Sequence, residues 1–276
     1  MKDRRFLIAS TGFVPYLDNY PYMELAFRLA KSLHMAGAQV RMFMPKFGVI
    51  NERKLQLHEV IRLSGVNIVV DDEDIPLTIK VSSIPKERMQ VYFIDSLENF
   101  HGKMIWKDEN GNLRPDLTDF MLFFAKSTVE TAKKLNWNAD YVINLGWFTS
   151  FLPLYLKTYY KDEPLLSHTE TVHILVNDEP YEGELPVDPE KKFIFDDILP
   201  EEYQYYLPSE RINLFKGASQ YADLLINGEE DLEPELKKIF DSGTQLKGKV
   251  NLSMLQENPR IFGEIMKQFQ TLGHND

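Results

Sequence analysis

The chain has 276 residues and a formal net charge of −11, because 42 aspartates and glutamates outnumber 31 lysines and arginines. This length suffices for one large domain or two small ones. An acidic surface repels the phosphates of nucleic acids and of anionic lipids, so we expect neither nucleic acid nor membrane as a partner. The sequence has no cysteine, which excludes disulfides, thiolate catalysis and zinc sites with cysteine ligands.

The amino terminus carries three basic residues before a short apolar run at residues 6–9. Polar residues and a glycine interrupt this run, and no signal-peptidase site follows it. We therefore interpret the run as a buried first strand. No apolar run in the sequence reaches the ~20 residues that a membrane span needs, and we expect a cytoplasmic location.

The first elements alternate between strand and helix. Apolar residues at spacings of three and four over residues 22–33 predict a helix packed on a core, and Gly37 is suited to end it in the left-handed conformation. A second strand is expected at residues 40–44. This order implies parallel strands joined by a right-handed crossover.

Between residues 57 and 95 the pattern changes toward a period of two, which is typical of short strands. The expected strands cover residues 60–63, 66–70, 77–81 and 89–94. The acidic run at residues 71–74 is interpreted as a solvated turn rather than a metal site.

A long helix is expected to begin near Asp116, followed by a turn, a buried strand and a further helix that begins at Trp147. Ligands of parallel α/β sheets bind beyond the carboxyl ends of the strands. The end of this strand, residues 143–147, offers one amide, Asn144, and no acid, base, phosphate donor or metal ligand. The chemistry expected of an α/β enzyme is therefore largely absent from this edge.

The remaining pattern predicts strands at residues 171–176 and 224–226, separated by a proline-rich acidic loop at 182–201 and by a helix at 212–222 that Ser209 caps. Further helices are expected near Pro234 and after Pro259, the last with an apolar stripe. Taken together, the elements predict a single Rossmann-like, doubly wound, mostly parallel sheet with a small antiparallel insert.

Five stretches together resemble the bacterial glycogen and starch synthases, a family of retaining glycosyltransferases that use ADP-glucose. They follow the order and spacing of that family: PKFGVINERKLQLHEVIRLSG (45–65), VYFID (91–95), KKLNWNAD (133–140), GWFTSFLPLYLKTYY (146–160) and INLFKGASQYAD (212–223). The resemblance implies the amino-terminal, acceptor-handling lobe of a GT-B fold over residues 1–245. It also implies a tail with an amphipathic helix at 246–276, and a donor-binding second lobe absent from these residues.

The motifs that the resemblance brings with it depart from the family pattern. Where the family has Lys-Thr-Gly-Gly-Leu to approach the donor phosphates, this chain has Pro15-Tyr16-Leu17-Asp18-Asn19-Tyr20, in which Asp18 would repel a phosphate. The family's Asp-Asn-x-Arg-Phe becomes Asp116-Leu117-Thr118-Asp119-Phe120, with an acid in place of the arginine.

Two further motifs are changed beyond the central strands. The family's His-x-His-Asp-Trp becomes Ile143-Asn144-Leu145-Gly146-Trp147, and its Thr-x-His-Asn becomes Thr171-Val172-His173-Ile174, with Asn177 displaced. The candidate substrate-binding residues are those that match or neighbour these motifs: Tyr16, Asp18, Asn19, Asp116, Asp119, Asn144, Trp147, His173 and Asn177. No catalytic residue, metal ligand or cofactor is assigned.

Each candidate also has a purely structural interpretation. Trp147 either stacks on a sugar ring or packs the strand–helix junction, and His173 either faces a ligand or is a satisfied core histidine. Asp116 and Asp119 form either a polar wall or a helix N-cap with an acid at its third position. The first loop, with Tyr16 and its neighbours, either holds a sugar or contacts another chain.

Four functional hypotheses follow from the resemblance. The chain is a catalytically silent lobe that serves as a binding or regulatory module of glycogen metabolism, or half of a split synthase completed by a separate donor-lobe chain or a second copy. Alternatively it is an ADP-glucose-dependent synthase that extends α-1,4-glucan, or a maltooligosaccharide-binding protein. The corresponding partners are α-1,4-glucan or maltooligosaccharide, a homo-oligomer, or the donor-lobe chain.

Overall fold

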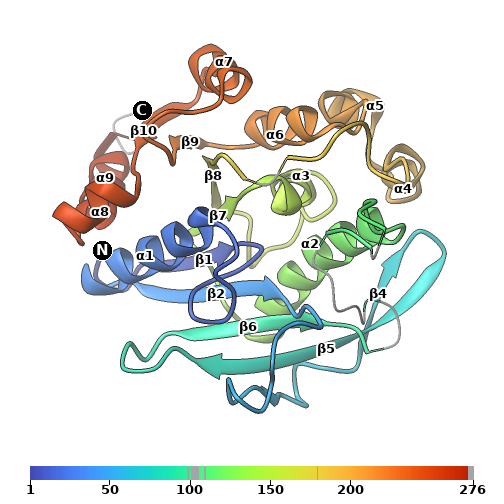
Figure 1. Cartoon of the computed structure of the whole chain (residues 1–276), viewed down its shortest axis with the longest axis horizontal. Helices are drawn as coiled ribbons and strands as arrows, with labels where there is room; N and C mark the ends of the chain where they lie inside the picture. Colours follow the sequence, from blue (N-terminus) through green and yellow to red (C-terminus); the bar gives the residue numbers. More distant parts are fainter. Residues whose placement is uncertain (98–99, 101–105, 109, 179, 273–276) are drawn as a thin grey trace.

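The computed structural model describes residues 1–97, 100, 106–108, 110–178 and 180–272. Within these ranges the strands form one sheet in the order β10-β9-β8-β7-β1-β2-β6-β5-β3, with β4 paired to β5 (Figure 1). The strands are β1 (Arg5–Ala9), β2 (Gln39–Pro45), β3 (His58–Glu59), β4 (Val66–Val70), β5 (Glu73–Ser83), β6 (Gln90–Asp95), β7 (Tyr141–Leu145), β8 (Glu170–Leu175), β9 (Leu224–Asn227) and β10 (Leu246–Lys249).

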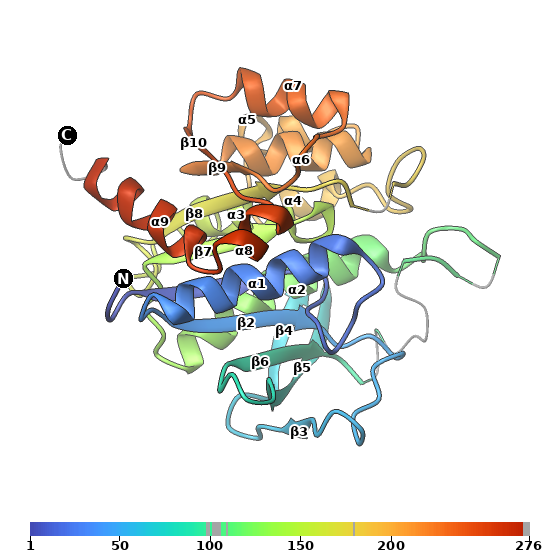
Figure 2. The same ribbon diagram turned by 60° about the vertical axis from the view of Figure 1, so that its left-hand side comes forward.

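Helices cover both faces of the sheet (Figure 2). They are α1 (Pro21–Met35), α2 (Leu117–Lys134), α3 (Phe151–Lys157), α4 (Glu190–Phe195), α5 (Pro200–Tyr203), α6 (Arg211–Gln220), α7 (Pro234–Ser242), α8 (Leu252–Glu257) and α9 (Ile261–Leu272), with 3-10 turns η1 (Trp147–Thr149) and η2 (Gln204–Tyr206). Helices α8 and α9 pack with α1, whereas α2, α3, α6 and α7 pack in succession on one another. Among the described helices, none is long and apolar enough to cross a bilayer.

The strands from β10 to β6 run parallel, and the sheet is doubly wound about β1. Ile8 of β1 stands in register with Met42 of β2 on one side and Ile143 of β7 on the other. All three side chains are fully buried. Continuous apolar strands are what a parallel sheet covered on both faces requires. The predicted fold class is thus confirmed, with its switch point between β1 and β7.

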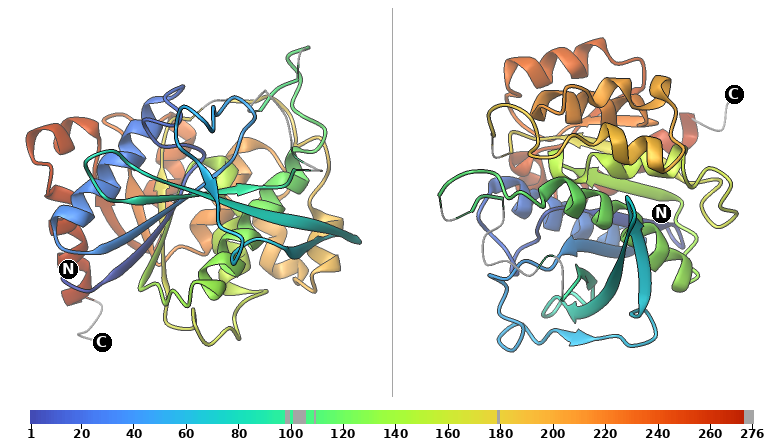
Figure 3. Two further views of the ribbon diagram at one scale, coloured as in Figure 1. Left: turned by 90° about the horizontal axis from the view of Figure 1, so that it is seen from below. Right: turned by 90° about the vertical axis from the view of Figure 1, so that its right-hand side faces the viewer.

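The antiparallel insert lies at one end of the sheet, where β5 pairs antiparallel with β6, β3 and β4 (Figure 3). The strand predicted at residues 60–63 is wrong: after Val60 the backbone turns, and the amide of Leu63 donates to the Val60 carbonyl at 2.9 Å. The acidic run is divided, since Asp71 and Asp72 make the turn between β4 and β5 while the next two acids begin β5.

Two predictions between β8 and β9 also fail. The segment expected to be a loop at 182–201 contains α4 and the start of α5, because Phe193 is fully buried against Phe151 and Tyr203. Ser209 does not cap α6: Glu210 holds the N-cap position without a side-chain hydrogen bond. Ser209 is buried, and its carbonyl accepts from the hydroxyl of Tyr181 at 2.9 Å.

Residues beyond 245 extend the same sheet and cover the same face as α1. Strand β10 pairs in parallel with β9, and Phe262 and Met266 of α9 are fully buried. The amide of Gly263 donates to Ser32 Oγ at 3.2 Å, and a Cβ at position 263 would lie 2.6 Å from the Cβ of Ala36. The absence of a side chain at Gly263 lets the two helices approach closely.

Replacement of Gly263 by leucine is expected to lower the free energy of unfolding by about 1–3 kcal/mol, since the new side chain has no room beside Ala36. Urea denaturation measures this loss. Lys267→Leu, on the exposed side of the same helix, is the matched control. Equal stability of the two variants would contradict the close packing of α9 on α1.

Candidate functional site

The carboxyl ends of β1, β7 and β8 meet at one edge of the sheet, beside the switch point where an open α/β sheet offers its ligand crevice. From these ends the chain continues into Ser10 after β1, Gly146 after β7 and Val176 after β8. This edge is therefore the candidate functional site.

The turn after β7 is built around a glycine. Gly146 has φ 79° and ψ 168°, a backbone conformation that L side chains rarely adopt. A Cβ at this position would lie 2.8 Å from Oδ2 of Asp178. That oxygen accepts a 2.8 Å hydrogen bond from the backbone amide of Trp147. The turn and the acid therefore fit together only because residue 146 has no side chain.

Asp178 lies at this candidate site but was not predicted from the sequence. It is buried, and its Oδ1 lies 3.4 Å from Nη1 of Arg211, which also pairs with Glu233. Burial raises the pKa of Asp178 to about 8, against the opposing effects of the Trp147 amide and Arg211. The only signal in the sequence is an acid shortly after a buried strand, and its partner Trp147 lies 31 residues away.

Trp147 is 2% exposed and belongs to an aromatic cluster. Its ring centroid lies 4.7 Å from that of Trp106 and 5.0 Å from that of Tyr181, with Phe148 at 6.3 Å. The tryptophan is thus packed at the junction of β7 and η1, and its ring is covered by other protein side chains.

Asn144 and His173 stand opposite each other in the register of β7 and β8. Both side chains are fully buried, and Asn144 Nδ2 lies 2.8 Å from His173 Nδ1. Burial lowers the pKa of His173 to about 3, so the ring is neutral at physiological pH. The pair lies inside the sheet rather than on the surface of the edge.

Hydrogen bonds of Asn177 connect the end of β8 to the loop that follows β9. Its backbone amide donates to Oε1 of Glu229 at 3.0 Å, its Nδ2 donates to the carbonyl of Asp231 at 2.9 Å, and its Oδ1 accepts from the amide of Glu233 at 2.9 Å. Both side-chain atoms of this candidate are therefore engaged in a structural contact.

The candidates in the first loop and at the start of α2 are exposed or bonded to other parts of the protein. Tyr16 is 6% exposed and its hydroxyl donates to Ser82 Oγ at 3.0 Å, whereas Asp18 and Asn19 are exposed. Asp116 does not cap α2, which corrects the capping interpretation. Its carboxylate instead accepts two hydrogen bonds from Arg114, at 2.6 and 3.0 Å, while Asp119 pairs with Lys192 at 2.7 Å.

Two buried lysines lie toward the same edge, beside the end of β2. Lys46 pairs with Glu52 at 2.8 Å, and Lys80 pairs with the same carboxylate at 2.7 Å and with Asp95 at 3.3 Å. Lys46 is 5% exposed and Lys80 8%. Their charges are neutralised within the protein, so neither is available to a phosphate in this conformation.

The structure thus brings Asn144, Trp147, His173 and Asn177 to neighbouring strand ends and engages each in protein contacts. A cavity of about 640 Å³ lies next to Tyr181, a neighbour of Trp147. Its lining includes Asn112, Tyr181, Glu182 and Glu184. Amides, carboxylates and an aromatic ring are side chains that can bind sugar hydroxyls and sugar faces. The substrate-binding roles of the nine candidates stay predictions.

A family model described as the starch synthase catalytic domain matches residues 24–251. The chain belongs to this family. The glycogen synthase of Chlorobium limicola is 32% identical over 224 residues, which cover 80% of this chain and 45% of that protein. The glycogen synthase of Chlorobium luteolum is 27% identical, covering 98% of this chain and 57% of that protein. The chain spans about half the length of the curated relatives that it matches.

The fold is similar to that of the starch synthase IV catalytic domain from Arabidopsis thaliana, solved with bound ADP and acarbose. The TM-score is 0.69 at 15% sequence identity, and the match covers 91% of this chain and 52% of that chain. This likeness confirms the predicted fold class, which is that of GT-B glycosyltransferases, and the family match confirms the predicted resemblance to glycogen and starch synthases.

The buried histidine predicts a pH dependence of stability. Above pH 6.5 the ring of His173 is neutral in both the folded and the unfolded chain. Below pH 6.5 the unfolded chain binds a proton at this ring, whereas in the folded chain the ring stays neutral down to about pH 3. The contribution of His173 to the free energy of unfolding should therefore decrease by roughly 3 kcal/mol as the pH is lowered from 7 to 4.

The substitution His173→Gln removes this titration, so the stability gap between wild type and variant should narrow between pH 7 and pH 4. Urea denaturation at the two pH values measures the gap. The exposed His168→Gln is the matched control for the replacement of an imidazole by an amide. A gap for His173→Gln that stays constant with pH would show that His173 is not held neutral.

Proposed function

We propose that this chain is a glycogen synthase-type lobe that is catalytically silent by itself and serves as a binding or regulatory module of glucan metabolism. One observation carries the proposal: the groups at the carboxyl ends of β7 and β8 are engaged with the protein itself. Trp147 is 2% exposed, Asn144 and His173 are fully buried, and the amide of Trp147 is bound by Asp178.

Catalysis of glucosyl transfer needs preorganised donors aimed at the charge that develops in the transition state, and one such donor contributes roughly 10²–10³ in rate. At this edge Asn144 Nδ2 is bonded to His173 Nδ1 and the Trp147 amide to Asp178, and the lysines beside β2 are paired with Glu52 and Asp95. Asn144 Oδ1 and His173 Nε2 have no hydrogen-bond partner among the described residues, but both atoms are buried. Phosphate binding would have to break the lysine–carboxylate pairs. The arrangement therefore supports a lobe without turnover.

A second candidate function is the binding of maltooligosaccharides, and the cavity beside Tyr181 favours it. The cavity offers the amide of Asn112, the ring of Tyr181 and the carboxylates of Glu182 and Glu184 on one surface. Its volume of about 640 Å³ can hold part of an oligosaccharide. Such binding needs neither a nucleotide nor a catalytic group.

Calorimetry of the purified chain with ADP-glucose, ADP and maltoheptaose tests both proposals. We expect no heat of binding from either nucleotide, and no glucosyl transfer from labelled ADP-glucose to glycogen. The glycogen synthase of Chlorobium limicola, assayed in parallel, is the positive control. Transfer by this chain in proportion to its concentration would contradict the silent lobe.

The maltoheptaose titration separates the second candidate from the first. If the cavity binds the oligosaccharide, Asn112→Ala should weaken binding by about tenfold, the loss expected for a hydrogen-bonding partner left unsatisfied. Asn138→Ala, an exposed amide before β7, is the matched control. Binding that Asn112→Ala leaves unchanged would exclude this cavity as the site.

A further inference from the structure

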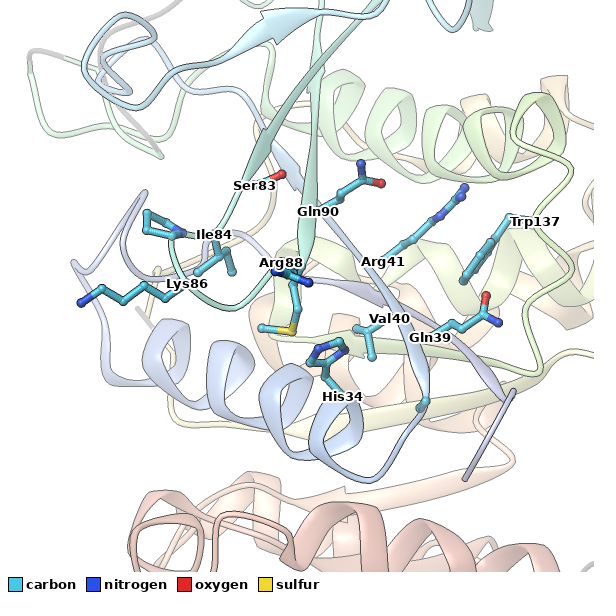
Figure 4. A pocket seen from close by; sticks show the side chains of 13 residues that line it. His34, Gln39, Val40, Arg41, Ser83, Ile84, Lys86, Arg88, Gln90 and Trp137 are labelled. Atoms are coloured by element: carbon cyan, nitrogen blue, oxygen red, sulfur yellow. The ribbon is translucent and has the colours of Figure 1, made fainter.

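A second pocket lies at the opposite, amino edge of the parallel strands (Figure 4). It has a volume of about 600 Å³ and forms where β2 and β6 begin, where β5 ends, and where α1 and the segment before β7 meet them. The polar side chains that matter for its chemistry are His34, Gln39, Arg41, Arg88, Gln90 and Trp137.

The lining of this pocket has a charge opposite to that of the whole chain. Arg41, Lys86 and Arg88 line it, and no aspartate or glutamate is among its described lining residues. The chain as a whole carries 42 acids against 31 lysines and arginines. Glu87, the acid within the same turn, is paired with Lys31 instead. The pocket therefore concentrates positive charge without an internal counter-ion.

Arg41 is held in place by aromatic rings rather than by a carboxylate. Its guanidinium carbon lies 3.9 Å from the ring centroid of Trp137 and 5.6 Å from that of Tyr92. Arg5 lies over the same tryptophan at 5.2 Å. Burial lowers the pKa of Arg41, and the charges of Arg5 and Arg62 lower it further while Tyr92 opposes them. A bound anion would relieve this repulsion.

Two donors in the lining have no acceptor within the described part of the chain. Arg41 Nη1 and Trp137 Nε1 are both buried and lack a hydrogen-bond partner there, and Trp137 is only 7% exposed. Guanidinium and indole nitrogens donate but do not accept. Buried polar groups are nearly always satisfied in folded proteins. A ligand that satisfies these two donors would have to supply acceptor oxygens.

We propose that this pocket binds a small oxyanion of the phosphate class, inorganic phosphate, pyrophosphate or a phosphate monoester. Arg41 acts as the charged donor and the indole N–H of Trp137 as a neutral one, while Lys86 and Arg88 add positive charge to the lining. The planar fork of an arginine matches the spacing of phosphate oxygens. Because Arg5 and Arg41 lie over the ring of Trp137, recognition comes from the oxyanion and not from stacking of a base. The site lies on the other edge from the glucan-metabolism proposal and is independent of it.

Calorimetry of the full chain with pyrophosphate and with inorganic phosphate, at constant ionic strength, tests the proposal. Wild type should bind at least one of the two, and Arg41→Gln should weaken binding about 10–100-fold. Arg88→Gln, at an exposed position that does not threaten folding, removes a charge from the lining and should weaken binding about threefold. Trp137→Phe, which keeps an aromatic ring and removes the donor, should weaken binding about threefold to tenfold.

The matched control is Arg53→Gln, an exposed arginine in the loop that follows β2 at the carboxyl edge, which should leave the affinity unchanged. No binding of either anion to wild type at millimolar concentration overturns the proposal. A loss of affinity in Arg53→Gln equal to that of the pocket variants also overturns it, since the affinity would then depend on net charge alone. Retention of poly-glutamate without any phosphate binding would also overturn it, because the surface would then serve an acidic polypeptide.

Discussion

The hydrogen bond from the Trp147 amide to Oδ2 of Asp178 is the interaction on which the carboxyl edge of this sheet depends. It joins the ends of β7 and β8 at 2.8 Å, and it requires the left-handed glycine at position 146. The bond fixes the direction in which the chain leaves β7 and places Trp147 against Trp106 and Tyr181. At the edge where an open α/β sheet binds its ligands, Asn144, Trp147 and His173 are buried among the protein's own side chains.

The basic side chains at the two edges of the sheet differ in whether an acid neutralises them. At the carboxyl edge Lys46 and Lys80 are paired with Glu52. At the amino edge Arg41 rests on Trp137, and its Nη1 has no hydrogen-bond partner among the described residues. Among the described residues, the lysines of the carboxyl edge are thus paired, whereas a cationic donor at the amino edge has no hydrogen-bond partner.

The framework could be predicted from the sequence because it rests on local periodicity. The apolar run of β1 and the helical stripe of α1 are such signals, and both elements were found within one or two residues of their predicted ends.

Strand β10, in contrast, leaves most of its side chains exposed, so the sequence LKGK carries no hydrophobic pattern and the strand was not predicted. Asp178 was missed because its role comes from a contact across 31 residues. The capping role expected of Asp116 failed because Arg114, two residues away, competes for its carboxylate.

Amide hydrogen exchange over residues 146–150, with and without ADP-glucose and maltoheptaose, tests the closed carboxyl edge most directly. We predict that the Trp147 amide exchanges only through opening that costs nearly the full free energy of unfolding, and that neither ligand changes its rate. Rapid exchange of this amide in the free protein, or added protection in the presence of ADP-glucose, would contradict the account.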